Sequence, residues 1–187
     1  METEYEVRIL EIDVADAIKR LKRIGAKKEW DLLQRRYVYD LIPKVEGKWV
    51  RLRTNGKKTT LTIKDVVSSE IDGTRELEIE VDDFEKCYEI LKELGYEDRG
   101  YQENRRMQYK YEDVEIDIDY WPLIPTYMEI EGPSEEKVYK IVELLGYNRE
   151  ECTARDVDGI YIDYGYDVKK IDCLKLEEER KWQYMKI

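Results

Sequence analysis

The chain has 187 residues, with 33 Lys and Arg against 44 Asp and Glu and no histidine, so its formal net charge is −11. This length can bury a core of its own, and at 42% hydrophobic residues the chain is too apolar to be disordered. The absence of histidine excludes Ser-His-Asp and Cys-His triads and every His-ligated zinc site. The acidic balance argues against a general nucleic-acid binder, because such proteins neutralise phosphates with a basic surface.

The N-terminal residues METEYEVRIL lack the basic and apolar regions of a signal peptide, and no stretch approaches the ~18 apolar residues that span a bilayer. The cysteines Cys87, Cys152 and Cys173 are odd in number and none belongs to a C-x-x-C pair, which argues against a disulfide framework. We therefore expect a cytoplasmic protein without membrane contact.

A strand followed by a capped amphipathic helix is predicted three times along the chain. Each helix begins at an Asp or Ser, whose side-chain oxygen can cap the N-terminus, and ends at a glycine that accommodates a left-handed exit. The helices run from Asp13 to Gly25, from Asp83 to Gly95 and from Ser134 to Gly146. Apolar residues at helical spacing on each one predict that the helices cover a sheet.

Eight strands are predicted, most of them joined by hairpins at turn signals such as Asn55-Gly56 and Glu112-Asp113. In chain order they are Glu4–Glu11, Arg36–Asp40, Lys48–Thr54, Thr59–Lys64, Glu76–Val81, Arg105–Tyr111, Val114–Asp119 and Tyr127–Glu131. Closing antiparallel strands into a barrel removes free edges. We therefore expect an α+β fold, an eight-stranded closed antiparallel β-barrel with the amphipathic helices outside. Residues 1–165 form this domain, and residues 166–187 are expected to be a charged helical tail, a candidate lid or plug.

Charged and apolar side chains alternate along nearly every predicted strand, so parity separates two faces of the sheet. The charged face is divided by sign, whereas an exposed face usually mixes signs to limit repulsion. The acidic side chains are Glu76, Glu78, Glu80, Asp117, Asp119, Glu129 and Glu131, and the basic ones are Arg51, Arg53, Lys64 and either Arg105 or Arg106. If helices cover the apolar face, the charged face lines the barrel; the simpler alternative is an antiparallel sheet with its charged face in water.

Converging carboxylates are hard oxygen ligands suited to Mg²⁺ or Mn²⁺, and converging Arg and Lys side chains suit phosphate oxygens. Together on one inner surface they favour a complex of a divalent metal and a polyphosphate, in which the metal neutralises part of the phosphate charge.

Six short motifs follow one another along residues 1–165. E-Y-E-V-R is followed by R-L-R, T-L-T-I-K-D, E-L-E-I-E-V, N-R-R-M-Q-Y and D-Y-W-P-L-I-P-T-Y-M-E-I-E. In this order they resemble the signatures of the CYTH superfamily, the triphosphate tunnel metalloenzymes, which include class IV adenylyl cyclases, thiamine triphosphatases and tripolyphosphatases. The resemblance implies the same eight-stranded tunnel.

The resemblance also implies roles for individual residues. Divalent metal would bind Glu4, Glu6, Glu129 and Glu131, with Asp119 on a second ion or a water, and the triphosphate would bind Arg8, Arg51, Arg53, Lys64 and Arg105 or Arg106. Glu78, Glu80 and Asp117 are further candidate tunnel acids that would otherwise pair with tunnel cations. Of these, Arg8 and Asp119 are the candidate catalytic residues.

Two features depart from the family pattern. Arg8 stands where the family has lysine, and arginine is always charged, so a general-base role is in doubt while phosphate anchoring survives. On the strand of N-R-R-M-Q-Y, Arg106 shares parity with Gln108 and Lys110, whereas Arg105 lies at the distance from Asp119 expected of relatives. The choice between the two arginines is open.

The first hypothesis is metal-dependent hydrolysis of a linear triphosphate, inorganic tripolyphosphate or an organic one, by water attack on the terminal phosphorus. The runner-up is a class IV adenylyl cyclase that forms cyclic AMP and diphosphate from ATP. A third reading is a degenerate CYTH domain that binds nucleotide or polyphosphate without turnover. The expected partner is a small-molecule triphosphate, and a homodimer is compatible with the sequence.

Overall fold

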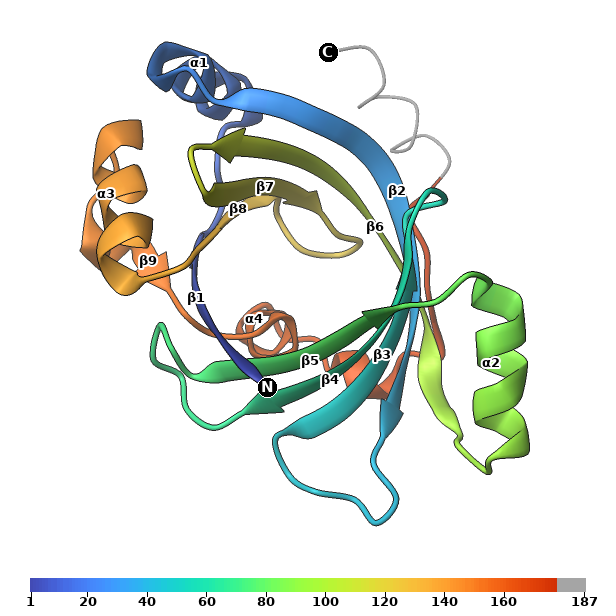
Figure 1. Ribbon diagram of the computed structural model, residues 1–187. Coiled ribbons are helices and arrows are strands. Elements are labelled where there is room, and N and C mark those ends of the chain that lie inside the picture. The colour runs from blue at the N-terminus through green and yellow to red at the C-terminus, as the bar shows by residue number, and fades with distance from the viewer. Residues whose placement is uncertain (178–187) are drawn as a thin grey trace.

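The computed structural model describes residues 1–177, and eight of its strands close into an antiparallel barrel (Figure 1). The barrel strands are β1 (Glu2–Ile9), β2 (Lys27–Asp40), β3 (Lys48–Thr54), β4 (Thr59–Val66), β5 (Thr74–Glu80), β6 (Asp98–Tyr111), β7 (Val114–Tyr120) and β8 (Tyr127–Gly132). Around the barrel they pair in the order β6-β2-β3-β4-β5-β1-β8-β7, and β7 pairs with β6 to close the ring. The predicted fold class is confirmed.

The three predicted helices all form between the expected caps. They are α1 (Val14–Ile24), α2 (Phe84–Glu93) and α3 (Glu135–Leu145), and the side chains of Asp13, Asp83 and Ser134 each accept a bond from the backbone N–H three residues on. At the other end, Gly25 and Gly146 take left-handed conformations that a side chain would disfavour. Among residues 1–177, no helix combines the length and the apolar character needed to cross a membrane.

The apolar faces of the strands pack outward against helices, as the parity of the sequence requires. Helices α1 and α3 cover β1, β7 and β8, where Leu21 and Val138 are fully buried with Ile116 and Ile130. Helix α2 covers β3, and Phe84 packs in a second apolar cluster there. With the apolar sides buried outside the barrel wall, the charged sides of the same strands face its interior.

One end of the barrel is crossed by a fourth helix, α4 (Val157–Asp163), which lies within the outline of the ring in Figure 1. It packs through Ile160 and Tyr161 against Trp121 and Tyr127, and the Tyr161 hydroxyl donates a hydrogen bond to the Pro122 carbonyl. The short elements around it are η1 (Arg149–Glu151), β9 (Cys152–Thr153), η2 (Val168–Lys170) and β10 (Cys173–Leu174).

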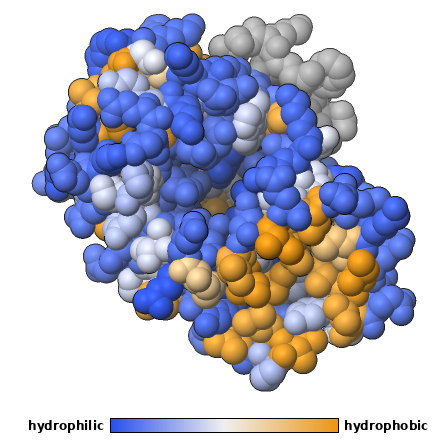
Figure 2. Space-filling model, viewed as in Figure 1, coloured by the Kyte–Doolittle hydropathy of each residue, from blue (hydrophilic) through white to orange (hydrophobic). Residues whose placement is uncertain are grey.

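The outer face of β5 is not covered by a helix among the described residues. Leu77 and Ile79 are 53% and 56% exposed there, and Figure 2 shows apolar residues gathered on the side of the molecule that carries α2 and the β3–β5 strands. The homodimer that the sequence left open stays a prediction.

Two strands are longer than predicted. β2 and β6 each span 14 residues and pair with each other along most of their length, whereas the sequence indicated only Arg36–Asp40 and Arg105–Tyr111. The early halves were missed because polar residues on both faces, such as Gln34 and Arg35 on β2 and Asn104 and Arg105 on β6, obscure the alternation. The Asn55-Gly56 signal opens a loop of residues 55–58, in which the Asn55 side chain accepts hydrogen bonds from the Lys57 and Lys58 backbone N–H groups.

The expected helical tail is wrong for residues 166–177, and its remainder lies outside the described residues. The described part contains the short η2 turn and β10, which adds to β6 as a parallel strand. Val168, Leu174 and Leu176 are each 3% exposed, so this part of the chain is packed onto the barrel. Because many residues of this segment are charged, the sequence pattern did not reveal the apolar residues through which it contacts the barrel.

Replacing Leu21 with Ala should destabilise the fold by about 2–5 kcal/mol, because Leu21 is 0% exposed between α1 and the barrel wall and its loss leaves a cavity. The matched control is Leu94→Ala at the end of α2, which is 67% exposed and should change stability by less than about 0.5 kcal/mol. Urea unfolding measures both. Equal losses for the two variants would contradict the described packing of the helices.

Candidate functional site

A cavity of about 240 Å³ lies inside the barrel and is lined mainly by charged and polar side chains. Ten of the side chains predicted as site residues line it: Glu4, Glu6, Arg8, Arg51, Arg53, Lys64, Glu78, Arg106, Glu129 and Glu131. They come from six different strands, β1, β3, β4, β5, β6 and β8, whose inward parity brings them together. The alternative of a charged face turned to water is therefore wrong for these residues.

Three carboxylates converge on one side of the cavity. Glu6, Glu129 and Glu131 each offer an oxygen atom, and these atoms lie within 4.8 Å of one another. The β1–β8 register, in which Glu6 pairs with Glu131 and Arg8 with Glu129, produces this convergence. Burial raises the pKa of Glu131 to about 7, and the neighbouring carboxylates Glu4, Glu129 and Glu6 add to the rise. The group therefore carries negative charge that its protein neighbours do not fully neutralise.

Arg8 links two of these carboxylates. Its Nη2 atom lies 2.7 Å from Glu6 Oε2 and 2.7 Å from Glu129 Oε2, and its Nη1 donates to the Arg155 carbonyl at 2.8 Å. Burial would lower the pKa of Arg8, but Glu129 and Glu6 outweigh it and raise that pKa. The guanidinium stays charged and holds the two carboxylates at a fixed separation.

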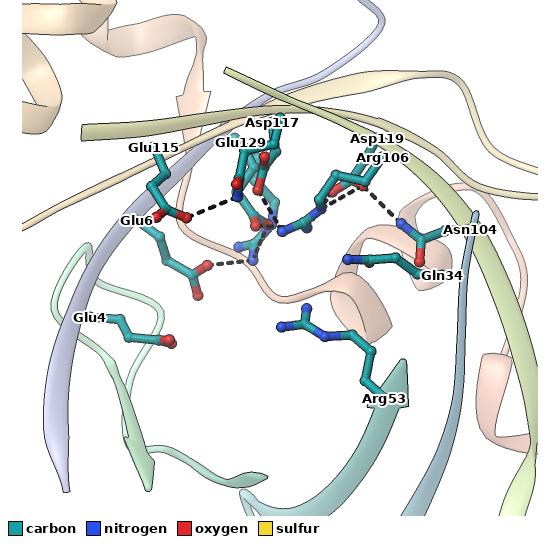
Figure 3. Close-up of polar contacts among 12 residues, drawn as sticks. Glu4, Glu6, Gln34, Arg53, Asn104, Arg106, Glu115, Asp117, Asp119 and Glu129 are labelled. Atoms are coloured by element: carbon teal, nitrogen blue, oxygen red, sulfur yellow. Dashed lines mark hydrogen bonds and ion pairs between the residues drawn. The ribbon is translucent and has the colours of Figure 1, made fainter. Parts of the chain in front are cut away.

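Arg106 organises the opposite edge of the acidic group (Figure 3). Its guanidinium contacts Asp119 and Asp117 at 2.5 Å and Glu129 at 3.0 Å. Asn104 donates a further hydrogen bond to Asp119 at 2.8 Å. Burial would raise the pKa of Glu129, yet Arg8 and Arg106 lower it well below its ordinary value. Glu129 is thus kept ionised between two arginines.

The cations of the other wall differ in how fully they are paired. Lys64 Nζ lies 3.1 Å from Glu4 and 2.6 Å from Glu76. Arg51 lies 3.3 Å from Glu76 and 3.6 Å from Glu78. Among residues 1–177, Arg53 has one ion pair, a distant one of 3.9 Å to Glu78, and in Figure 3 its guanidinium points into the open centre of the cavity.

Four predicted site residues do not line the cavity. Asp117 and Asp119 are buried and each contacts Arg106 at 2.5 Å, so neither lines the cavity; Asp119 supports Arg106, and the predicted metal and catalytic roles of Asp119 stay predictions. Glu80 is exposed and pairs with Lys58 at 2.9 Å. Arg105 lies on the outer face, paired with Asp31 at 2.7 Å, because the register sets Arg106, not Arg105, opposite Asp119. The sequence left the choice between Arg105 and Arg106 open, and the register places Arg106 inside the barrel.

Several residues that line the cavity were not predicted from the sequence. Gln34 and Arg36 share parity on β2, but the predicted strand started only at Arg36 and no motif covered either residue. Trp121, Asp156 and Asp158 line the end crossed by α4 and lie outside the predicted strands. Only long-range pairing brings these groups to the cavity, so no local signal in the sequence could have found them.

A second cavity of about 310 Å³ adjoins the first at the other end of the barrel. The two share Trp30, Gln34, Arg53, Glu78, Gln108 and Glu115 in their linings. At this end an indole ring and side-chain amides line the cavity together with the charged residues Arg53, Lys58, Glu78 and Glu115. The arrangement offers an elongated anion a cationic wall, a carboxylate group opposite it, and room beyond for an uncharged part.

Comparisons with known proteins support the same family that the motifs indicated. A family model described as the CYTH domain matches residues 2–155. No curated protein matches the chain.

Solved structures share the fold at low sequence identity. A conserved hypothetical protein from Pyrococcus furiosus is 24% identical with a TM-score of 0.71, and the match covers 83% of this chain and 98% of that chain. A provisionally assigned adenylate cyclase from Vibrio parahaemolyticus is 14% identical with a TM-score of 0.72, covering 86% and 98%. A provisionally assigned adenylyl cyclase from Hippeastrum, described as having a dominant triphosphatase activity, is 15% identical with a TM-score of 0.54, covering 100% and 97%.

The raised pKa of Glu131 predicts how stability depends on pH in metal-free protein. Its pKa of about 7 in the folded state exceeds the ordinary value of 4.5, so the folded state binds the proton more tightly. The contribution of Glu131 to stability is therefore fully present below pH 4.5 and is lost as pH rises through 7. Glu131→Gln removes the charge, and it should raise the free energy of unfolding at pH 8 by up to about 3 kcal/mol while changing it little at pH 4.

Urea unfolding in a chelator at the two pH values measures this difference. Glu80→Gln is the control, because the Glu80 side chain is 71% exposed, and it should show no comparable gain at pH 8. A loss of stability in Glu131→Gln at pH 8 would contradict an uncompensated carboxylate at this position.

Proposed function

Because the chain belongs to the CYTH family, we propose that it catalyses the divalent-metal-dependent hydrolysis of a linear triphosphate, by attack of water on the terminal phosphorus. The observation that carries this proposal is the convergence of Glu6, Glu129 and Glu131 within one cavity whose other wall carries Arg51, Arg53 and Lys64. A triphosphate complexed with a divalent cation has the complementary distribution of charge.

The acidic group fits Mg²⁺ or Mn²⁺. All three donors are carboxylate oxygens, which are the ligands that these hard cations prefer, and the raised pKa of Glu131 marks negative charge that a cation would neutralise. Glu6, Glu129 and Glu131 would hold the ion, with Glu4 beside them on β1. Asp119 is a weaker candidate for a second ion than the family pattern implies, because its oxygens already accept from Arg106 and Asn104.

A bound divalent ion supplies positive charge that polarises water and phosphate oxygens. The protein's own part is to bind and orient. Arg51, Arg53 and Lys64 contact the phosphates, and their charge stabilises the diphosphate that leaves as the terminal phosphoryl group is transferred to water. The preformed barrel wall keeps these groups in place before substrate arrives, which lowers the cost of reorganisation.

Arg8 and Arg106 act on the carboxylates and not as proton acceptors. An arginine cannot take a proton at neutral pH, so Arg8 does not serve as a general base. Its bonds to Glu6 and Glu129 fix their positions, and Arg106, itself held by Asp117 and Asp119, fixes Glu129 from the other side. Arg8 is therefore proposed as a positioning residue, and its assignment as a catalytic group is set aside.

The second candidate is a class IV adenylyl cyclase, in which the ribose 3′-hydroxyl attacks the α-phosphorus and diphosphate leaves. The observation in its favour is the adjoining cavity with Trp30, Gln34 and Gln108, which offers a ring and amides to a nucleoside. The Vibrio parahaemolyticus relative is provisionally assigned this activity, and the Hippeastrum relative is described as mainly a triphosphatase. We favour hydrolysis because water needs no further partner group in the cavity.

The third reading, binding without turnover, would follow if the bonds of Arg8 leave no group able to promote attack. One assay separates the three functions. Incubation with Mg²⁺ or Mn²⁺ and either tripolyphosphate or ATP yields orthophosphate from a hydrolase, cyclic AMP and diphosphate from a cyclase, and no product from a binding protein.

Replacing Glu129 with Gln should reduce metal-dependent turnover roughly 100-fold or more, because it removes one carboxylate charge and breaks the contacts of both arginines. Steady-state kinetics with Mg²⁺ and Mn²⁺ measure the effect, and Mn²⁺-induced thermal stabilisation, present in the unmodified protein and lost in the variant, reports metal binding independently of activity. Glu80→Gln should behave as the unmodified protein. Full activity in Glu129→Gln would refute the assigned metal site.

Replacing Arg53 with Ala should raise KM for the triphosphate roughly 10- to 100-fold, with a smaller effect on kcat, because Arg53 points into the cavity with only one distant carboxylate. Lys86→Ala on α2 is the control, since its side chain is 79% exposed. An unchanged KM in Arg53→Ala would count against a phosphate contact.

A further inference from the structure

One cation of the cavity wall belongs to none of the family motifs. Arg36 lies on β2 directly opposite Arg53 of β3 in the sheet register, and it lines the same cavity. It is only 6% exposed. A charged side chain in so buried a place normally has a carboxylate partner.

Arg36 has no such partner among residues 1–177. Its Nη2 atom donates to Gln34 Oε1 at 3.2 Å and to Asn104 Oδ1, both neutral amides. The guanidinium lies 4.5 Å from the centre of the Trp121 ring, and its buried Nε has no hydrogen-bond partner. The contacts hold the side chain in place but leave its charge uncompensated.

The other cations of the cavity differ from Arg36 in this respect. Arg8, Lys64 and Arg106 each contact two or more carboxylates at 3.1 Å or less. These carboxylates largely neutralise their positive charge. Within the described part of the chain, Arg53, with one carboxylate contact at 3.9 Å, is the lining cation that resembles Arg36. The two are neighbours across adjacent strands, which makes their corner of the cavity the most strongly cationic part of its lining.

Without a bound anion, these buried positive charges destabilise the folded protein. Burial lowers the pKa of Arg36, and the nearby cations Arg53, Arg51 and Arg106 lower it further, which together outweighs the opposite effect of the more distant carboxylate of Asp119. Burial lowers the pKa of Arg53 in the same way, helped by Arg51 and Arg106. Because arginine stays protonated at neutral pH, the repulsion between Arg36 and the neighbouring cations persists until an anion binds.

We propose that Arg36 and Arg53 form an oxyanion subsite for one phosphate group of the polyphosphate, and that Arg36 sets the part of the affinity that does not depend on metal. The proposal rests on the proposed function for its ligand class. The Trp121 ring and the two amides fix the guanidinium plane in advance, so little conformational freedom is lost on binding. Because Nη2 donates to the two amides and Nε is buried, the Nη1 N–H groups are the ones that would donate to oxygens of one phosphate group.

The test is isothermal titration calorimetry with sodium tripolyphosphate in a chelator, which removes divalent metal. The unmodified protein should bind, and Arg36→Gln should bind roughly 10- to 100-fold more weakly, the effect of losing a hydrogen-bonded charge. Arg35→Gln is the matched control. Its guanidinium lies on the outer face, 2.9 Å from Glu85 and 42% exposed, so its loss should change the dissociation constant by less than about threefold.

A stability measurement separates a binding role from a merely structural one. Because Arg36 is an uncompensated buried charge, Arg36→Gln should keep or raise the urea midpoint of the ligand-free protein, while losing the stabilisation that tripolyphosphate confers. Arg36→Lys retains the positive charge but not the planar guanidinium, and it should recover part of the affinity that Arg36→Gln loses. A lowered midpoint with unchanged affinity for tripolyphosphate would assign Arg36 to structure and overturn the proposal.

The binding assay also distinguishes this proposal from the proposed function. Metal-free binding that Arg36→Gln weakens, in a protein that releases no orthophosphate when Mg²⁺ or Mn²⁺ is supplied, supports the subsite and refutes the hydrolase. Equal binding by Arg36→Gln and the unmodified protein, or no binding by the unmodified protein without metal, overturns the subsite whether or not hydrolysis is seen.

Discussion

The ion pairs of Arg8 and Arg106 with Glu129 hold together the centre of this molecule, because each buried charge there is tolerable only while its partners stay in place. Strands β1, β6, β7 and β8 must keep their register for these contacts to form. The helices contribute from outside, since burying the apolar sides of the strands commits the charged sides to the interior. The cavity and its chemistry thus follow from one alternating pattern in the sequence.

That pattern made most of the barrel predictable. Parity placed Glu4, Glu6, Arg51, Arg53 and Lys64 on the charged face of the sheet, which the structure turns inward, whereas the choice between Arg105 and Arg106, open in the sequence, follows from the register. Capping residues and terminal glycines located the three longer helices. These predictions succeeded because each depends on residues close together in the chain, where spacing alone determines which side chains share a face.

Other features depend on contacts between distant segments and could not be read from spacing. Asp119 has inward parity, yet Arg106 covers it, and no local pattern reveals that one inward side chain stands in front of another. Arg36 belongs to no motif, and its proposed role depends on the lack of a carboxylate partner among residues 1–177. Helix α4 reaches the cavity through Asp156 and Asp158 only because the chain crosses the end of the barrel.

The central claim is that one interior cavity holds a divalent cation on its acidic side and a polyphosphate on its basic side. Anomalous diffraction from crystals containing Mn²⁺ and a non-hydrolysable triphosphate tests it most directly. The account predicts a manganese peak bound by carboxylate oxygens of Glu6, Glu129 and Glu131, with phosphorus atoms beside Arg53. Manganese found only on the outer surface, or a triphosphate bound outside the barrel, would contradict it.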